Sequence, residues 1–407
     1  MIQPNPMPEK NQTDYLSVDE AIKKITGVLK PVTETERIVS VQAENRVLAD
    51  DLNAQHDIPA FDNSAMDGYV FLTKDLESGQ RKFRVDGEIR PEEGQPVELK
   101  PETGREIMTG SPVPPGNCTV VPIEMISESD KEVVVNEIPE RNPIRKQGEG
   151  YQKGKVVLPK GTVIRPYEVG LMIESGNSSC TVKKNIRVAI QVTGSEIDET
   201  RNSNGPVLNG IVGHWPGTEA KEWPILDDDP ELVEERMLRL KDSADVVLTT
   251  GGISAGKHDY ILGAMEKLGA EVIVRKVQQK PGKPITVTRL NGTLFFHLPG
   301  NPISAVFTAE YYARKAIHAM LGIEDDERSV LAANSFENHR PGKTLFVPGK
   351  LQLDSENRLT VSSEGVMKSH LMQLYHDSDV YVRLDPETEI AAGERVEVTP
   401  YTTTRLP

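Results

Sequence analysis

The chain has 407 residues, a length that predicts two or three domains rather than a single core. Its 47 basic and 62 acidic residues give a net charge of −15, which excludes the broad basic surface that non-specific nucleic-acid binding requires. No stretch approaches the roughly 18 consecutive apolar residues of a membrane span, and the first 14 residues lack the apolar core of a signal peptide, so we expect a cytoplasmic protein that contacts no membrane.

The first third of the chain combines one helix signal with many short strand signals. Ser17 and Glu20 have the capping-box spacing of a helix start, and apolar residues at helical spacing continue to Leu29, shortly before Pro31. From residue 53 to residue 141, short apolar runs alternate with Gly and Pro clusters, which is typical of a small β domain.

Two polar segments of this β domain have neither helical nor strand periodicity, and we expect structured loops there. Residues 61–69 contain Asp67, and residues 107–114 contain Thr109. Loops on a rigid scaffold often carry function, and ordinary turn chemistry is the alternative. Residues 142–182 are rich in glycine and predict a connector with one short helix, which begins at Pro166.

From Arg187 onward, buried strands and helices alternate, which predicts a parallel α/β domain with helices on both faces. Asp229 and Pro230 indicate a helix start, because aspartate caps a helix and proline suits its first position. Asn291-Gly292 indicates a hairpin, and after Asp325 short strands predict a C-terminal β domain. The predicted strands are 188–192, 245–250, 271–277, 285–289 and 293–297, and the later predicted helices are 260–268 and 303–321. The apolar stripe of the helix after Asp229 consists of Leu232, Val233, Met237, Leu238 and Leu240.

The segment 249–259, Thr-Thr-Gly-Gly-Ile-Ser-Ala-Gly-Lys-His-Asp, joins a predicted strand to a predicted helix. Ligands of open α/β sheets bind beyond the C-terminal ends of the strands, and a Gly-rich loop there offers free N–H groups to an anion. The spacing also fits the start of a P-loop, but His258 stands where that motif needs Ser or Thr for Mg²⁺. A plain strand-to-helix turn is a further alternative. Asp259 weakens it, because a carboxylate beside an anion site needs a metal or a donor to offset its charge.

Two further segments place anion-binding groups after predicted strands. Residues 276–284 contain a Pro-Gly turn from which Lys280 and Lys283 project near one point, as compact cations suited to an oxyanion. Residues 298–304 lead into a helix whose first turn contains Ser304. The alternatives are a solvated basic turn for the lysines and ordinary helix capping for the serine.

Carboxylates follow the predicted strands at the same edge of the sheet. Glu196, Asp228 and Asp259 could converge there, and carboxylates with few histidines suit Mg²⁺ rather than Zn²⁺. A surface position is an equal alternative for Glu196 and Asp228, and helix capping is the favoured role of Asp229.

Seven segments, in this order, resemble the molybdenum insertase (molybdopterin molybdenumtransferase) family, which includes the C-terminal domain of gephyrin. They are 61–69, 107–114, 193–197, 228–230, 249–260, 280–284 and 298–304. The resemblance implies a multidomain α/β plus β fold. Its domains would be an elongated connector domain (15–52 and 142–184), an inserted β domain (53–141), a molybdopterin-binding parallel α/β domain (185–323) and a C-terminal β-barrel (324–407).

The resemblance also implies an activity. Molybdate would be inserted into adenylylated molybdopterin, and Mg²⁺-dependent cleavage of the phosphoanhydride would release AMP. The enzyme would be a homodimer in which the inserted β domain of one subunit reaches the α/β domain of the other. Candidate protein partners are a molybdopterin adenylyltransferase and molybdoenzymes.

The resemblance assigns roles to individual residues. The catalytic set is Asp67, Thr109, Glu196, Asp228, Asp259, Lys280 and Lys283, of which Glu196, Asp228 and Asp259 would hold the metal. The set that binds the cofactor and molybdate is Thr250, Gly251, Gly252, Ser254, Gly256, Lys276, Pro299, Gly300, Asn301, Ser304 and Ser369.

Several departures from the family pattern leave other functions open. Gly150 stands where the family has an aspartate, Pro348 stands where it has an arginine, and Lys343 stands where it has another arginine. A helix that the family begins after an asparagine would follow Asn209 here, where Gly210 and Gly213 disfavour a helix. These departures favour a weakened paralogue that binds molybdopterin as a carrier or scaffold. A P-loop NTPase and a molybdopterin adenylyltransferase are the remaining alternatives.

Overall fold

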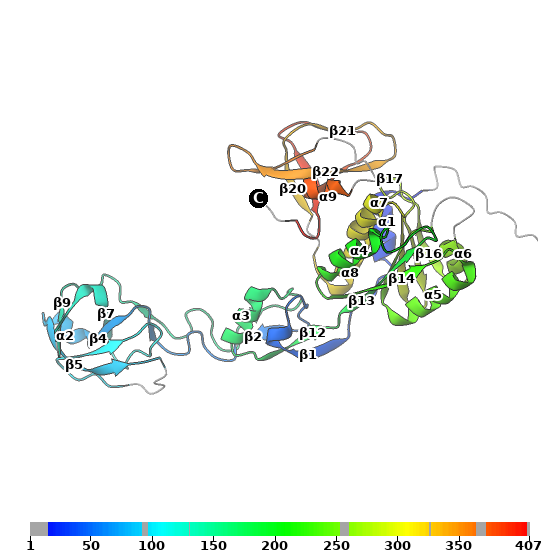
Figure 1. Ribbon diagram of the computed structural model, residues 1–407. Helices are drawn as coiled ribbons and strands as arrows, with labels where there is room; N and C mark the ends of the chain where they lie inside the picture. The colour runs from blue at the N-terminus through cyan, green and yellow to red at the C-terminus, as the bar shows by residue number, and fades with distance from the viewer. Residues whose placement is uncertain are drawn as a thin grey trace, which may run out of the picture. The chain divides into compact units, whose positions relative to one another are not determined.

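The computed structural model describes residues 15–91, 97–129, 131–252, 260–324, 327–363 and 372–404 (Figure 1). The chain divides into two compact units. One unit consists of residues 1–36, 45–47 and 182–407, and the other of residues 37–44 and 48–181. We call them the α/β–barrel unit and the small β unit, and the four domain boundaries drawn from the sequence stay predictions.

The small β unit is built on a six-stranded sheet in the order β7-β4-β6-β5-β9-β8. Its core contains Phe71 and Phe83, whose rings lie 4.4 Å apart, and Gly104 is required because a Cβ there would overlap the Phe71 ring. The strands are β4 (Gly68–Leu72), β5 (Lys82–Ile89), β6 (Thr103–Ile107), β7 (Cys118–Pro122), β8 (Ile126–Ser129) and β9 (Glu132–Val135). The predicted β domain is therefore present.

Short elements complete this unit. The predicted loop at 61–69 is partly strand, because Asn63–Ser64 (β3) pairs with the distant Ile144–Arg145 (β10). The predicted helix after Pro166 is confirmed as α3 (Pro166–Glu174). The other elements are β2 (Leu52–Asn53), β11 (Val156–Leu158), α2 (Thr73–Glu77) and the 3₁₀ turns η2 (Ser40–Gln42) and η3 (Ile123–Met125). The chain passes between the two units within β1 (Thr35–Val39) and β12 (Ser179–Lys183).

The α/β–barrel unit contains a six-stranded sheet in the order β14-β13-β15-β19-β18-β16. The first four strands are parallel, as predicted, whereas β18 pairs antiparallel with β19 and β16 pairs antiparallel with β18. The reversal follows from the predicted hairpin: Asn291 and Gly292 both have positive φ, the geometry of a two-residue turn. The strands are β13 (Ile186–Thr193), β14 (Thr218–Leu226), β15 (Val246–Thr250), β16 (Glu271–Arg275), β18 (Thr286–Leu290) and β19 (Thr293–Leu298).

Helices cover both faces of this sheet, as predicted (Figure 1). α5 and α6 pack on one face, against Ala189, Val247 and Phe295. Side chains of successive strand residues point to opposite faces, and α4 and α7 pack from the other side. The helices of the unit are α1 (Val18–Thr26), α4 (Asn204–Gly213), α5 (Pro230–Ser243), α6 (Tyr260–Lys267), α7 (Pro302–Thr308) and α8 (Arg314–Leu321).

Local helix signals are confirmed, and the ends of the helices differ from the predictions. Ser17 and Glu20 form the full capping box of α1, but α1 ends at Thr26 rather than Leu29. Asp229 caps α5 by accepting two backbone N–H bonds. The predicted helix 303–321 is one continuous helical run in which α7 and α8 are joined by a π-helical turn, η4 (Ala309–Ala313).

The apolar stripe of α5 is narrower than predicted. Val233, Met237 and Leu240 are buried, whereas Leu232 is 46% exposed and Leu238 is 39% exposed. Only positions on one side of the helix meet the sheet and α6, so apolar character alone overestimated the buried face.

Residues 200–226 contain a regular helix and a strand, although Gly210 and Gly213 disfavour a helix by propensity. The helix is α4, which begins at Asn204 and has Asn209 inside it, and the strand is the edge strand β14. α4 packs against β14 and β13. This packing of helix against strands outweighs the weak helix propensity of glycine.

The C-terminal part of this unit is a closed barrel, as predicted. Its strands pair in the order β22-β23-β20-β26-β24, and β24 returns to β22. The strands are β20 (Arg328–Ala332), β22 (Thr344–Leu353), β23 (Leu359–Ser362), β24 (Val380–Leu384) and β26 (Arg395–Pro400). β17 (Gln279–Lys280) adds to β22, β21 (Phe336–Asn338) pairs with β25 (Thr388–Ile390), and α9 (Gln373–Asp377) is helical. A Cβ at Gly349 would lie 2.5 Å from Val361 Cγ2, so glycine there allows the barrel core to close.

Candidate functional site

The loops predicted to bind a ligand all leave the sheet at the C-terminal ends of its parallel strands. β13, β15 and β19 are adjacent and parallel, and Thr250 lies opposite both Val192 and Leu298. The residues that follow these strands therefore emerge together at the C-terminal ends of the strands, where α/β sheets bind ligands.

Thr250 connects these loops. Its hydroxyl donates to the Pro299 carbonyl at 3.1 Å and accepts from Asn204 Nδ2 at 2.8 Å. Asn204 Nδ2 also donates to the Gly300 carbonyl at 2.9 Å. Asn204 stands at the start of α4 and was not predicted as a site residue, because the glycines after it disfavour a helix by propensity.

Asn204 also presents an unused acceptor at this edge. Its Oδ1 atom is buried and has no hydrogen-bond partner among the described residues. A buried acceptor without a partner is costly, so a bound donor at this position would be stabilising.

Gly251 and Gly252 have positive φ values of 93° and 64°. A Cβ at Gly251 would overlap the Thr193 carbonyl oxygen, and one at Gly300 would lie 3.6 Å from the Gly251 Cα. Glycine is needed here because three neighbouring loops approach one another closely. Close approach to a ligand, the reason inferred from the sequence, stays a prediction.

Two of the three predicted carboxylates lie at the ends of β13 and β14. Asp228 N donates to Ser195 Oγ at 3.0 Å, and Ser195 N donates to Asp228 Oδ2 at 3.4 Å. Both oxygens of Glu196 lie 3.1 Å from where a Cβ of Gly194 would stand. Glu196 thus lies on the turn 194–196, and Asp228, which follows β14, is hydrogen-bonded to Ser195 of that turn.

The third carboxylate, Asp259, lies outside the described residues, as do Ser254, Gly256 and Ser369. Within the described ranges, no group of three or more His, Cys, Asp or Glu side chains could hold a metal ion. Glu196 and Asp228 provide the oxygen ligands that Mg²⁺ accepts, and Mg²⁺ in proteins often needs only one or two carboxylates in addition to substrate phosphates.

The lysine segment packs against the helix that contains Ser304. Lys276 has a positive φ of 61°, and Val277 N donates to the Lys283 carbonyl at 3.0 Å, which closes the turn. Gly282 contacts Thr308, one turn after Ser304 on α7. The three lysines are half-buried, and in the described part of the chain none of them forms an ion pair.

In the small β unit, the two predicted loops meet. The Asp67 carboxylate accepts from the backbone N–H of Thr109 at 2.7 Å and from its hydroxyl at 2.8 Å. These two bonds, the backbone one first, lower the pKa of Asp67 below its ordinary value. Asp67 and Thr109 are therefore one paired group, although they come from separate segments.

One histidine of the sheet is fully buried, close to the C-terminal ends of the strands. His297 is fully buried between Thr249 on β15 and Thr288 on β18, with both ring nitrogens 2.9 Å from a threonine hydroxyl. Burial lowers its pKa to about 3, so the imidazole is neutral at physiological pH. No sequence signal identified this residue.

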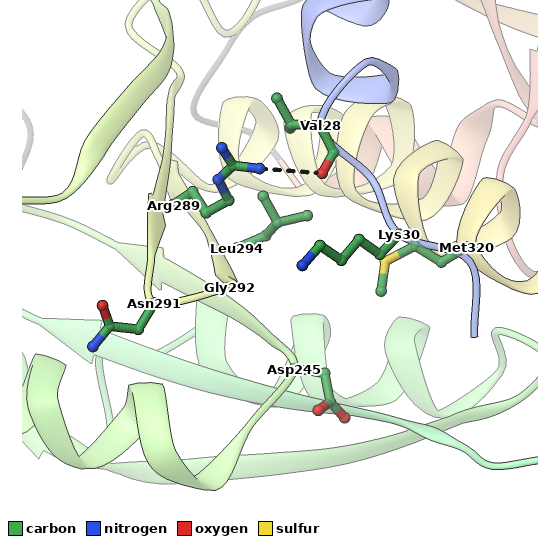
Figure 2. A pocket seen from close by; sticks show the side chains of 8 residues that line it. All are labelled: Val28, Lys30, Asp245, Arg289, Asn291, Gly292, Leu294 and Met320. Atoms are coloured by element: carbon green, nitrogen blue, oxygen red, sulfur yellow. Dashed lines mark hydrogen bonds between the residues drawn. The ribbon is translucent and has the colours of Figure 1, made fainter. Parts of the chain in front are cut away.

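A cavity of about 320 Å³ lies at the opposite end of the sheet, where the parallel strands β15 and β19 begin, and Figure 2 shows its lining. Arg289 reaches the Val28 carbonyl at 3.5 Å and pairs with Glu271, and Asp245 pairs with Arg187. None of the predicted site residues lines this cavity, which is formed by Val28, Lys30, Asp245, Arg289, Asn291, Gly292, Leu294 and Met320.

Comparison with known families gives three adjacent matches. Residues 16–176 match the MoeA N-terminal region (domains I and II), residues 189–319 a probable molybdopterin binding domain, and residues 332–401 the MoeA C-terminal region (domain IV). No helix in the described part of the chain combines the length and apolar composition that crossing a bilayer requires.

Curated relatives and solved structures match nearly the whole chain. A molybdopterin molybdenumtransferase of Bacillus subtilis is 30% identical, over 94% of this chain and 93% of the relative. One of Haemophilus influenzae is 28% identical, over 95% and 98%. The crystal structure of a molybdopterin biosynthesis moeA protein from Pyrococcus horikoshii matches with a TM-score of 0.75 at 23% identity, over 95% of this chain and all of that one.

Proposed function

Because the chain belongs to the molybdopterin molybdenumtransferase family of molybdenum cofactor biosynthesis, we propose that it inserts molybdate into adenylylated molybdopterin and releases AMP in a Mg²⁺-dependent step. The observation that carries the proposal is the convergence of the three loops tied together by Thr250 at the edge of the sheet, beside the carboxylates of Glu196 and Asp228.

The loops that follow β13, β15 and β19 are suited to binding the phosphoanhydride. The backbone at Gly251 and Gly252 can approach a phosphate without side chains in between, and Asn204 Oδ1 can accept from a donor of the pterin or nucleotide. In the reaction, molybdate forms two Mo–S bonds to the dithiolene, and one of its oxygens leaves as water with the two thiol protons. A second water attacks the phosphoanhydride, whose P–O bond breaks, and its oxygen and protons complete the two phosphate groups of AMP and the pterin.

Glu196 and Asp228 would hold the metal. When bound, Mg²⁺ neutralises phosphate charge and assists the leaving group. The Ser195 bonds fix Asp228 at the end of β14, so this carboxylate is positioned before the substrate arrives. Asp259 stays a predicted third ligand.

The lysine segment supports binding of molybdate. Lys276, Lys280 and Lys283 are half-buried cations, and Ser304 lies in the first turn of α7, near the turn that carries them. Ammonium groups and a hydroxyl at a helix start are suitable donors to a tetrahedral dianion. Ser369 stays a predicted additional contact.

We extend the proposal to the organisation of the enzyme. It acts in the cytoplasm as a homodimer with the four predicted domains, and its candidate partners are a molybdopterin adenylyltransferase and molybdoenzymes. In this proposal Asp67 and Thr109 take part in catalysis as the paired group that their hydrogen bonds form.

The proposal is tested by AMP release from adenylylated molybdopterin with molybdate, with and without Mg²⁺. We expect Asp228→Asn and Glu196→Gln each to slow release by about 100-fold, because a metal contributes several kcal/mol to stabilising the transition state. Asp227→Asn, at the exposed neighbouring position, is the matched control and should release AMP at the normal rate. Equal rates for all three variants, or release that is indifferent to chelation, would refute the proposed metal site.

The carrier alternative rests on Gly150 and Pro348. A Cβ at Gly150 would lie 3.1 Å from the Ile58 carbonyl oxygen, and Gly150 N donates to the same oxygen at 3.0 Å, so the local backbone favours glycine over the family's aspartate. Pro348 lies in β22 opposite Tyr381. A carrier would bind the adenylylated pterin and release no AMP at any molybdate concentration.

A further inference from the structure

A tyrosine faces two lysines of the proposed molybdate site. The centre of the Tyr15 ring lies 4.8 Å from Lys283 Nζ and 5.6 Å from Lys276 Nζ. Both distances fall within the range of about 6 Å in which a cation is attracted to the face of an aromatic ring. Neither the sequence motifs nor the proposed function gives Tyr15 a role.

The backbone fixes Tyr15 at this place. The carbonyl of Leu16 accepts from Gln278 N at 2.8 Å, and Leu16 forms a parallel bridge with Val277. One residue further on, Ser17 caps α1, which packs against β16 and α8. The chain that follows Tyr15 therefore holds the ring against the lysine segment.

The lysine segment is shaped to bring two cations to this ring. Lys276 has a positive φ of 61°, a conformation that residues with a side chain adopt rarely. The bond from Val277 N to the Lys283 carbonyl then closes the turn. Two like charges beside one ring repel each other, so the arrangement favours an anion that binds between or beside them.

The two carboxylates that follow Tyr15 in the described part of the chain are engaged elsewhere. Asp19 forms two 2.9 Å contacts with the Arg383 guanidinium, and Glu20 accepts from Ser17 N at 2.8 Å. A carboxylate paired with the lysines would neutralise them and compete with an oxyanion. An aromatic ring holds the ammonium groups in place and leaves their net charge available.

We propose that Tyr15 is a positioning residue of the oxyanion site, whose ring orients the ammonium groups of Lys276 and Lys283 toward a tetrahedral dianion. The inference rests on the proposed function for the identity of that dianion, molybdate. Tyr15 itself need not touch the substrate, and its effect should be confined to the dependence on molybdate.

The full chain is compared with three variants. Tyr15→Leu keeps apolar volume and removes the ring, Tyr15→Phe keeps the ring, and Tyr167→Leu is the control at a tyrosine that is 81% exposed in the small β unit. We expect Tyr15→Leu to raise the molybdate concentration for half-maximal AMP release about three- to tenfold, the range that a cation–π contact can supply. The dependence on adenylylated molybdopterin, and the rate at saturating molybdate, should not change. Tyr15→Phe and Tyr167→Leu should match the parent protein.

A second readout does not depend on activity. In protein labelled with ¹³C at lysine Cε, the ring current of Tyr15 should shift two resonances in the parent and in Tyr15→Phe, and Tyr15→Leu should lose both shifts. If Tyr15→Leu leaves the molybdate dependence unchanged, or changes the pterin dependence equally, the inference is overturned. If the parent releases no AMP, the proposed function fails, and calorimetric titration with molybdate decides: weaker binding by Tyr15→Leu alone supports the inference, and equal or absent binding overturns it.

Discussion

The buried His297 should make the α/β–barrel unit sensitive to acid. Its ring lies between two threonine hydroxyls in the sheet, and each hydroxyl can donate to one ring nitrogen or accept from it. The neutral imidazole is therefore satisfied, and a second ring proton would introduce a buried charge without an anionic partner.

The sign of the effect follows from the two pKa values. The unfolded chain binds a proton at His297 near pH 6.5, and the folded chain does so only near pH 3. Between these values the unfolded state holds more protons, so stability is complete above pH 6.5 and falls as the pH is lowered. Between the two pKa values, each pH unit lowers the free energy of unfolding by about 1.4 kcal/mol. The loss is about 2 kcal/mol at pH 5 and about 5 kcal/mol over the whole interval.

The perturbation is His297→Gln, which removes the titrating group and keeps a donor and an acceptor. Urea unfolding is followed by tryptophan fluorescence, which reports this unit because Trp215 and Trp223, the chain's two tryptophans, both lie in it. The stability of the parent relative to the variant should fall by about 2 kcal/mol from pH 7.5 to pH 5. Replacing the exposed His376 by Gln controls for the loss of one imidazole. A stability difference between parent and variant that stays constant over this range would show that His297 does not cause the acid sensitivity.

Substitutions at four further positions test local features of the structure. Asp229→Ala should destabilise α5 by about 1 kcal/mol in urea unfolding, because the cap accepts two N–H bonds, and Asp229→Ser should retain most of the stability. Gly251→Ala should weaken binding of adenylylated molybdopterin, because its Cβ meets a neighbouring carbonyl at positive φ. At Gly263 on α6, an added Cβ would have no neighbour within 4 Å. Gly263→Ala should therefore raise the free energy of unfolding in urea by up to about 1 kcal/mol. Thr109→Val should raise the pKa of Asp67 toward its ordinary value in a carboxyl ¹³C NMR titration, while Thr109→Ser should keep it low.

Sequence signals that act over a few residues predicted their structures well. The Ser17–Glu20 capping box, the Asp229 cap and the Asn291-Gly292 hairpin each depend on hydrogen bonds or φ values within four residues. The loops at the strand ends were also predictable, because parallel strands deliver their C-terminal ends to the same edge of a sheet.

Features that depend on distant partners could not be predicted in the same way. α4 is stabilised by its packing against β14 and β13, and no local propensity reveals that contact. The role of Asn204 follows from the place of α4 beside β15 and β19, and His297 looks like one more residue in an apolar strand until its two threonine partners are known.

In the proposed function, molybdate insertion and AMP release are coupled at the C-terminal ends of the strands of the α/β sheet. We would test this coupling in a single-turnover reaction of the full chain with adenylylated molybdopterin and Mg²⁺ over a series of molybdate concentrations, in which AMP and active cofactor are measured together. Both products should appear with the same rate and the same dependence on molybdate. Tight binding of the pterin with neither product, or AMP release without active cofactor at saturating molybdate, would contradict it.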